Sequence, residues 1–326
     1  MRYSLLSRFR GAILGAALGD LWAVTNCSSL QNSTSVVRLA EKSSRAPIAD
    51  PAAVPMAWGA IATTIAQTLV HSASPAHQWR DWVILSQFPR ASSGDDDSAE
   101  IPEDPGGWAI ATLPLLLCYH DDFSNLRSHL AQIPGAARSD ALILGYTLAC
   151  ILQNQLNPTT LIAQLLTDLD LEHTDWVLAD HLAEVAKLIR SGASLAIAHR
   201  VLETSTQASS MPFALYCFLR TPEEYRLSLL STRDCARPTI TSALVGVLSG
   251  CMNTTAGLSS YRRNSFQKHS TDSLLLQSRW GVKTETALLD VADLLLAHWA
   301  GVYRPHQMPL TRHRWAIAAP NVIRPL

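Results

Sequence analysis

The sequence predicts an all-α protein built from many helices, and two observations support this. Apolar residues recur at intervals of three and four along most of the chain, which is the spacing of amphipathic helices. No convincing run of alternating β-branched residues with a hairpin turn is present. The 326 residues are 48% hydrophobic and 16% charged, so the chain can bury a large core. No stretch is long enough to be a clear interdomain linker, and we therefore expect residues 1–326 to form one domain.

The first helix is expected to begin near Ser4 and to continue through LLSRFRGAILGAALGDLWAV. Its arginines followed by a short apolar run are also typical of a secretory signal. However, Asp20 ends the run at once, and no cleavage site of small residues follows directly. A helix of the mature fold explains this segment better.

The same periodicity predicts six further helices, over residues 61–73, 108–119, 139–153, 159–169, 181–192 and 286–303. Three of the expected helix starts carry capping residues: Ser139-Asp140, Asn157 to Thr159, and Thr221 to Glu224. Gly192 is a plausible stop after Arg190. Polar, acidic or glycine- and proline-rich composition predicts loops at 26–35, 91–107 and 261–273.

Charge and cysteine content limit the class of protein. A net charge of −1 leaves no basic surplus, so neither nucleic acid nor a membrane is an expected partner. No stretch has the roughly 20 predominantly apolar residues of a membrane span. Of the six cysteines, Cys118, Cys150, Cys217 and Cys251 lie among apolar residues, and no cysteine pair has C-x-x-C spacing. We expect buried, reduced thiols rather than a zinc site or disulfides, and hence a cytoplasmic protein.

Two stripes of glycine indicate close helix packing. Gly11, Gly15 and Gly19 repeat every four residues, and Gly246 and Gly250 have the same spacing in a later segment. Residues four apart lie on nearly one face of a helix. Glycine inside a helix costs about 1 kcal/mol relative to alanine, so close contact is the expected compensation. The sequence therefore predicts two central helices that touch along these stripes.

The first stripe also carries a family resemblance. RFRGAILGAALGD resembles the N-terminal signature of the ADP-ribosylglycohydrolase family, which includes the dinitrogenase reductase-activating glycohydrolases. Three further segments are similar to that family in the same order: PGGWAIATLPLLLCYHDD (105–122), SSMPFALYCFLRTPEEYRLSLLST (209–232) and ALVGVLSGCMNTTAGL (243–258). The resemblance implies a single-domain orthogonal helix bundle with a cleft on one side.

The resemblance also implies a chemistry. Members of the family hydrolyse N- or O-glycosidic ADP-ribosyl bonds with two divalent cations, usually Mg²⁺ or Mn²⁺. Their ligands come from an early Thr-Asp-Asp-Thr motif and a late Gly-Asp-x-Asp-Thr motif. Such ligands suit Mg²⁺, which prefers carboxylate and other oxygen donors.

This chain departs from the family at both motifs. The early motif falls at Ala57 to Ala60, where Trp58 and Gly59 stand and no carboxylate is present. In the late motif, Arg237 and Thr239 replace the two aspartates. The family's arginine before Pro114 is Ala111 here. At the late motif, an arginine stands where carboxylates would offset the charge of the metal ions. The charge at this position is therefore positive instead of negative, and we expect no metal cofactor.

Several of these residues have two interpretations. Asp20 matches a Gly-Asp element of the family, and a structural role is favoured over ligand binding. Arg237 could hold a diphosphate or could be an ordinary surface or salt-bridged arginine near Asp234. Trp58 could fill the former cleft as a core residue or offer a platform for adenine. The triplet Asp95 to Asp97 is either a solvated acidic loop or a substitute metal site.

Three functions follow from these interpretations. The first is a catalytically inactive member of the family, a pseudoenzyme that regulates or binds an unidentified protein partner. The second is an active hydrolase of ADP-ribosyl bonds whose metal ligands have moved to Asp20, Asp234 or Asp95 to Asp97. The third is a metal-free binder of a nucleotide or an ADP-ribose-like ligand, with Arg237 on its phosphates.

Overall fold

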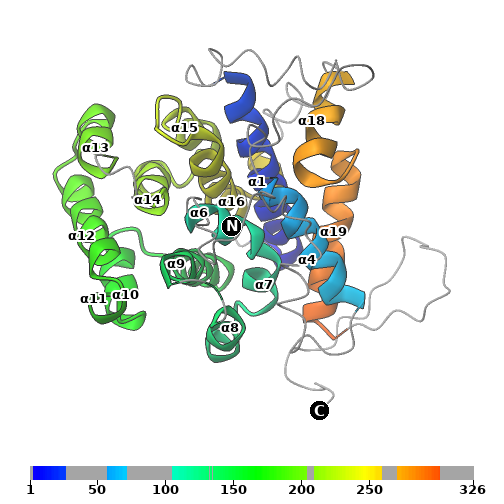
Figure 1. The fold of residues 1–326 in the computed structure, drawn as a ribbon, viewed down its shortest axis with the longest axis horizontal. Helices are drawn as coiled ribbons and strands as arrows, with labels where there is room; N and C mark the ends of the chain where they lie inside the picture. Colours follow the sequence, from blue (N-terminus) through cyan, green and yellow to red (C-terminus); the bar gives the residue numbers. More distant parts are fainter. Residues whose placement is uncertain are drawn as a thin grey trace, which may run out of the picture.

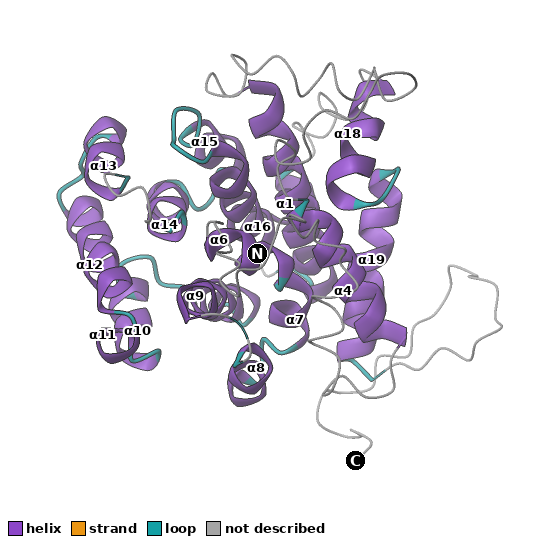
Figure 2. Ribbon diagram, in the orientation of Figure 1, coloured by secondary structure: helices purple, strands orange, loops and turns teal. Residues whose placement is uncertain are grey.

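The computed structural model describes residues 3–26, 57–71, 105–131, 133, 135–203, 209–258 and 270–301. Within these ranges the chain folds into helices and contains no strand, as Figure 2 shows. The prediction of an all-α protein is therefore confirmed. The helices are α1 (Leu5–Asn26), α4 (Trp58–His71), α6 (Pro105–Ala111), α7 (Leu113–Cys118), α8 (Phe123–Leu130), α9 (Gly135–Leu152), α10 (Leu161–Asp168), α11 (Leu171–Thr174), α12 (Trp176–Arg190), α13 (Leu195–Leu202), α14 (Met211–Arg220), α15 (Tyr225–Leu230), α16 (Pro238–Gly257), α18 (Ser270–Trp280) and α19 (Glu285–Trp299).

The two glycine helices, α1 and α16, form the centre of the bundle and run antiparallel (Figure 1). Gly15 faces Gly246 and Gly250, and Gly19 faces Ser242. A Cβ atom added to Gly15 would lie 2.9 Å from the Gly250 Cα and closer still to the Gly246 carbonyl oxygen. Only backbone occupies this contact, so the predicted contact between the two stripes is confirmed.

Two further features fix the register of this pair. The Tyr225 hydroxyl, from α15, donates a 2.9 Å hydrogen bond to the Gly15 carbonyl oxygen in the middle of α1. Near its C-terminal end, α16 changes direction at Thr254, whose φ is 60° and whose Cα faces Gly11. A positive φ is rare for a β-branched residue, so the kink places local strain at this end of the contact.

Two groups of helices flank this pair (Figure 1). Helices α10 to α13 form an outer layer, which α14 connects to α16. Helices α4, α18 and α19 pack together beside α1 on the other side. Buried side chains from every described helix belong to one hydrophobic cluster, so the two groups share a core.

The observed helix ends confirm some predictions and correct others. Helix α1 begins at Leu5, as expected, and α12 ends at Arg190 before Gly192, whose φ is 61°. Ser139-Asp140 was expected to start a helix but lies inside α9, which begins at Gly135. Both residues are buried: Asp140 accepts a 2.5 Å hydrogen bond from Ser209 Oγ, and the Ser139 hydroxyl donates to the Gly135 carbonyl oxygen within α9, so neither side chain caps the helix start.

Two predicted loops are wrong at one end. Helix α6 begins at Pro105, inside the expected loop, because proline suits the first turn of a helix and Gly107 packs against the Trp58 indole. Helix α18 begins at Ser270, inside the other expected loop. The rest of both loops lies outside the described residues.

The cysteines largely match their expected environment. Cys118, Cys217 and Cys251 are buried, as is Cys235, and Cys150 is half-buried. All five are free thiols, and burial raises the pKa of Cys118 and of Cys251 to about 12. Cys118 and Cys251 are therefore protonated at neutral pH, and a protonated thiol is a poor nucleophile. A cytoplasmic location remains a prediction.

Helix α9 is the one helix in the described part of the chain that is long and apolar enough to cross a membrane. Core helices of soluble proteins can have the same length and composition, and 67% of this stretch is buried inside the protein. It also contains the buried Asp140 carboxylate. The packing of α9 is that of a core helix.

A buried histidine is expected to make the fold sensitive to acid. The His120 ring contacts the rings of Phe9 and Trp299, with centroid distances of 5.7 Å and 5.1 Å, and its Nδ1 is 2.7 Å from the Leu117 carbonyl oxygen. Burial lowers the pKa of His120, and it lowers the pKa of His298 and of His129 in the same direction.

The unfolded chain therefore takes up protons at a higher pH than the folded chain does. The stability that the neutral, buried histidines contribute is fully present above the unfolded histidine pKa of about 6.5. It is lost as the pH falls toward the lower pKa of the folded state. We expect the melting temperature to fall between about pH 7.5 and pH 5.5, and the fall to be smaller in His120→Phe. A melting temperature that stays constant or rises over this range in the parent protein would contradict the prediction.

Candidate functional site

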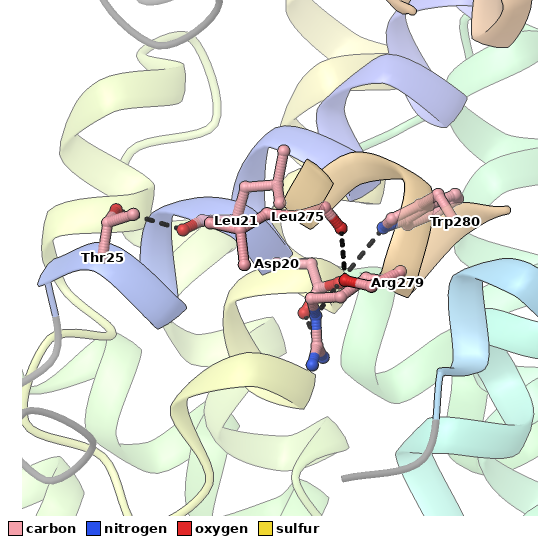
Figure 3. A network of polar contacts seen from close by, with 7 residues as sticks. Asp20, Leu21, Thr25, Leu275, Arg279 and Trp280 are labelled. Atoms are coloured by element: carbon pink, nitrogen blue, oxygen red, sulfur yellow. Dashed lines mark hydrogen bonds and ion pairs between the residues drawn. The ribbon is translucent and has the colours of Figure 1, made fainter. Parts of the chain in front are cut away.

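A buried ion pair joins Asp20, in the second half of α1, to Arg279 of α18 (Figure 3). Arg279 donates to both carboxylate oxygens of Asp20, from Nε to Oδ2 at 2.7 Å and from Nη2 to Oδ1 at 2.6 Å. The Trp280 indole nitrogen donates to Oδ2 at 3.1 Å. Three donors from the end of α18 thus converge on one carboxylate of α1.

The pair is almost closed to solvent. Asp20 is 5% exposed and Trp280 is 1% exposed. Desolvation lowers the pKa of Arg279, but the charge and hydrogen bonds of Asp20 outweigh it, so the pKa is raised. Arg279 therefore remains a guanidinium cation, held in the planar two-bond geometry that suits a carboxylate. The role of Asp20 in this structure is to neutralise that cation.

The start of α4 packs against the Trp280 side chain in the same region. The Trp280 indole covers Gly59, where an added Cβ would lie 2.7 Å from Cγ and closer still to Cδ2. Thr63 Oγ1 donates a 2.9 Å hydrogen bond to the Trp280 carbonyl oxygen, which ties the end of α18 to α4.

The neighbouring residue, Trp58, is also part of the core. It is 5% exposed, packs against Gly107 of α6, and lies 5.7 Å from the Trp108 ring. Ala111, which stands where the resemblance implies an arginine, is buried in α6 as well. The placement of Trp58 agrees with its interpretation as a core residue and leaves little of the indole available as a platform for a base.

The late-motif residues lie at the beginning of α16. Arg237 is the N-cap residue without a side-chain capping bond, and Thr239 follows in the first turn. Both are half-buried. Because Ser242 packs against Gly19, this turn lies near the end of α1 that carries Asp20.

The segment before α16 is held by α13. The Asp234 carbonyl oxygen lies 2.7 Å from His199 Nε2, and the Ala236 N–H donates to the Glu203 carboxylate at 3.1 Å. The Asp234 side chain itself is exposed. These contacts position the backbone of the segment and do not assemble a set of carboxylates.

The geometry does not fit a dinuclear metal site. Both oxygens of Asp20 are already bound, Trp58 and Gly59 offer no ligand, and Arg237 and Arg279 bring positive charge. Among the described residues, no group of three or more His, Cys, Asp or Glu side chains could hold a metal ion. The triplet Asp95 to Asp97 lies outside the described residues.

Sequence reasoning singled out Asp20, Trp58, Gly59, Arg237 and Thr239 but missed Arg279 and Trp280. The structure joins Asp20, Gly59 and Trp280 through direct contacts, and it places Arg237 and Thr239 on the neighbouring helix end. A carboxylate inside an apolar glycine helix implies a cationic partner, because a buried charge is rarely left unpaired. That signal could predict a partner for Asp20 but could not identify which arginine it is.

Comparison with known proteins adds no family assignment. No protein-family model matches the chain, and no curated protein matches it at a significant level.

Proposed function

We propose that this protein is a catalytically inactive relative of the ADP-ribosylglycohydrolases, a pseudoenzyme that acts by binding a partner or by regulation. The observation that carries the proposal is the occupation of both Asp20 oxygens by Arg279. The glycine helices of the scaffold are present and tightly packed, whereas the positions that the resemblance assigns to metal ligands hold tryptophan, glycine, arginine and threonine.

Electrostatics support this interpretation. A divalent cation placed beside Asp20 would also face the Arg279 guanidinium. Two unit charges of the same sign at 4 Å repel by about 4 kcal/mol at an effective dielectric constant of about 20, and a divalent ion doubles that cost. The single carboxylate available here cannot offset this repulsion and four metal charges as well.

The test is an assay of ADP-ribose release from ADP-ribosyl-arginine and from an ADP-ribosylated protein. We expect no turnover above background with Mg²⁺, with Mn²⁺ or with a chelator, while an active glycohydrolase run in parallel turns over. Metal-dependent turnover by this chain would overturn the proposal and favour the hydrolase with relocated ligands.

A second candidate is a metal-free binder of an ADP-ribose-like ligand. It is favoured by the position of Arg237 at the N-terminus of α16, where main-chain N–H groups and a guanidinium both suit phosphate oxygens. If this function holds, ADP-ribose raises the melting temperature of the parent protein and has no effect on Arg237→Ala. The absence of a shift in the parent protein would remove this candidate.

A further inference from the structure

The first turn of α12 exposes an apolar pair on the outer layer of the bundle. Trp176 is 72% exposed and Val177 is 46% exposed. The turn itself is well formed, since Asp175 Oδ1 accepts a 3.2 Å hydrogen bond from the Leu178 N–H. The indole is therefore held out to solvent by a fixed helix start and is not the end of a frayed helix.

The surroundings of this pair are acidic. No lysine or arginine occurs between Asp168 and Glu184, whereas Asp168, Asp170, Asp175 and Asp180 all lie in that stretch. Asp168 and Asp170 are exposed at the end of α10, next to α11 and the start of α12. Asp180 is exposed one turn after Trp176, so the two side chains share a helix face.

The carboxylates on this edge keep capacity for a further partner. Asp170 Oδ1 pairs with His173 at 2.6 Å, and Asp168 Oδ2 accepts from the Tyr146 hydroxyl. Each carboxylate offers about four acceptor positions, and both of these, unlike Asp20, are exposed, so further donors can reach them. Arg127 of α8 approaches the same edge, but it donates to the Asp168 main-chain carbonyl oxygen at 2.7 Å.

We propose that this acidic tryptophan edge, made of Asp168, Asp170, Asp175, Trp176, Val177 and Asp180, docks an arginine-bearing basic segment of a partner protein. A guanidinium stacked on the Trp176 indole can also donate to the Asp180 carboxylate on the same face. Arginine is preferred to lysine because its planar group both stacks and forms paired hydrogen bonds. Charge complementarity selects a basic partner, and the exposed indole provides its anchor.

The edge is separate from the Asp20 site. In Figure 1, α12 lies at the outer side of the bundle away from α18. The inference therefore goes beyond the proposed function and does not depend on the resemblance to the glycohydrolases. A failed test here would leave the pseudoenzyme proposal intact, and the reverse also holds.

The test measures binding of a fluorescent peptide, with four arginines spaced among glycine and serine, to the full chain at low and physiological salt. We expect saturable binding that weakens with salt and is reduced at least about fivefold by Trp176→Ala. The pair Asp170→Asn with Asp180→Asn is expected to reduce binding by a similar factor. Asparagine is suitable at position 170 because it tolerates the positive φ of 53° found there.

Matched controls separate this edge from general charge and from exposed apolar area. Leu274→Ala changes an exposed leucine on α18, and Glu223→Gln with Glu224→Gln neutralises exposed carboxylates before α15. Both controls should bind the peptide like the parent, and a lysine version of the peptide should bind more weakly. Equal loss in the Glu223 and Glu224 control, or no loss in Trp176→Ala, would overturn the proposal. So would a dimer in light scattering that Trp176→Ala abolishes, since the edge would then serve a second copy of the chain.

Discussion

Replacing Gly15 by alanine is expected to destabilise the protein by about 3 kcal/mol or more, measured as the free energy of unfolding in urea. The added Cβ would meet the Gly246 carbonyl oxygen and the Gly250 Cα, both of which are backbone atoms. No side chain can rotate away to relieve this clash, so α1 and α16 must separate along their length. Alanine's helix propensity returns only about 1 kcal/mol of the loss.

The matched control is Gly135→Ala. Gly135 is the first residue of α9, and an added Cβ there meets nothing within 4 Å. The same chemical change should therefore leave stability unchanged or raise it slightly. Equal effects at positions 15 and 135 would show that the glycine contact between α1 and α16 is not tight.

Asp20→Asn is expected to cost about 3–5 kcal/mol, because it leaves the Arg279 guanidinium buried without its counter-charge. The side chains of Asp20 and Arg279 are only 7% and 12% exposed, so water cannot replace the lost carboxylate. The measurement is again urea unfolding. The double variant Asp20→Leu with Arg279→Met should be more stable than either Asp20→Asn or Arg279→Met alone, since it removes both charges.

A second ion pair in the same protein provides the control. Arg10 also donates to both oxygens of its partner Asp293, each at 2.6 Å, but these side chains are 35% and 25% exposed. We expect Asp293→Asn to cost no more than about 1 kcal/mol, because solvent screens this pair. If the two asparagine variants lose the same stability, burial is not what makes the Asp20 pair important.

Much of the central architecture could be predicted from local pattern. A spacing of four residues places Gly11, Gly15 and Gly19 on one face whatever surrounds them, so the sequence alone predicts a close helix contact. The register of that contact could not be predicted in the same way. Two glycine stripes can slide past each other by a turn, and it is the Tyr225 hydroxyl and the kink at Thr254 that distinguish this alignment.

The candidate site was only partly predictable, because its residues are joined across the chain. The structural interpretation of Asp20 agrees with its buried ion pair, but its partner lies 259 residues away. Nothing local in QSRWG marks Arg279 and Trp280 as the groups that reach α1. Ser139-Asp140 shows the opposite failure, since this pair resembles a helix cap but lies buried inside α9, where Asp140 accepts a tertiary hydrogen bond from Ser209.

The resemblance is the ground of the proposed relationship to the glycohydrolases, and its departures are the ground of the proposed loss of a metal site. Its aspartate motifs fall at positions that the structure fills with the Trp58 indole and the half-buried Arg237. The prediction that Asp20 does not bind metal rests on its contacts with Arg279 and Trp280, which are independent of the resemblance. A titration can therefore test it without reference to any relative.

The most direct measurement is calorimetric titration of the protein with Mn²⁺, with and without ADP-ribose present. Because Arg279 and Trp280 already bind the Asp20 carboxylate, we predict no saturable heat of binding up to millimolar Mn²⁺ in either condition. Micromolar binding of Mn²⁺ that Asp20→Asn abolishes, in a variant shown to remain folded, would contradict the account.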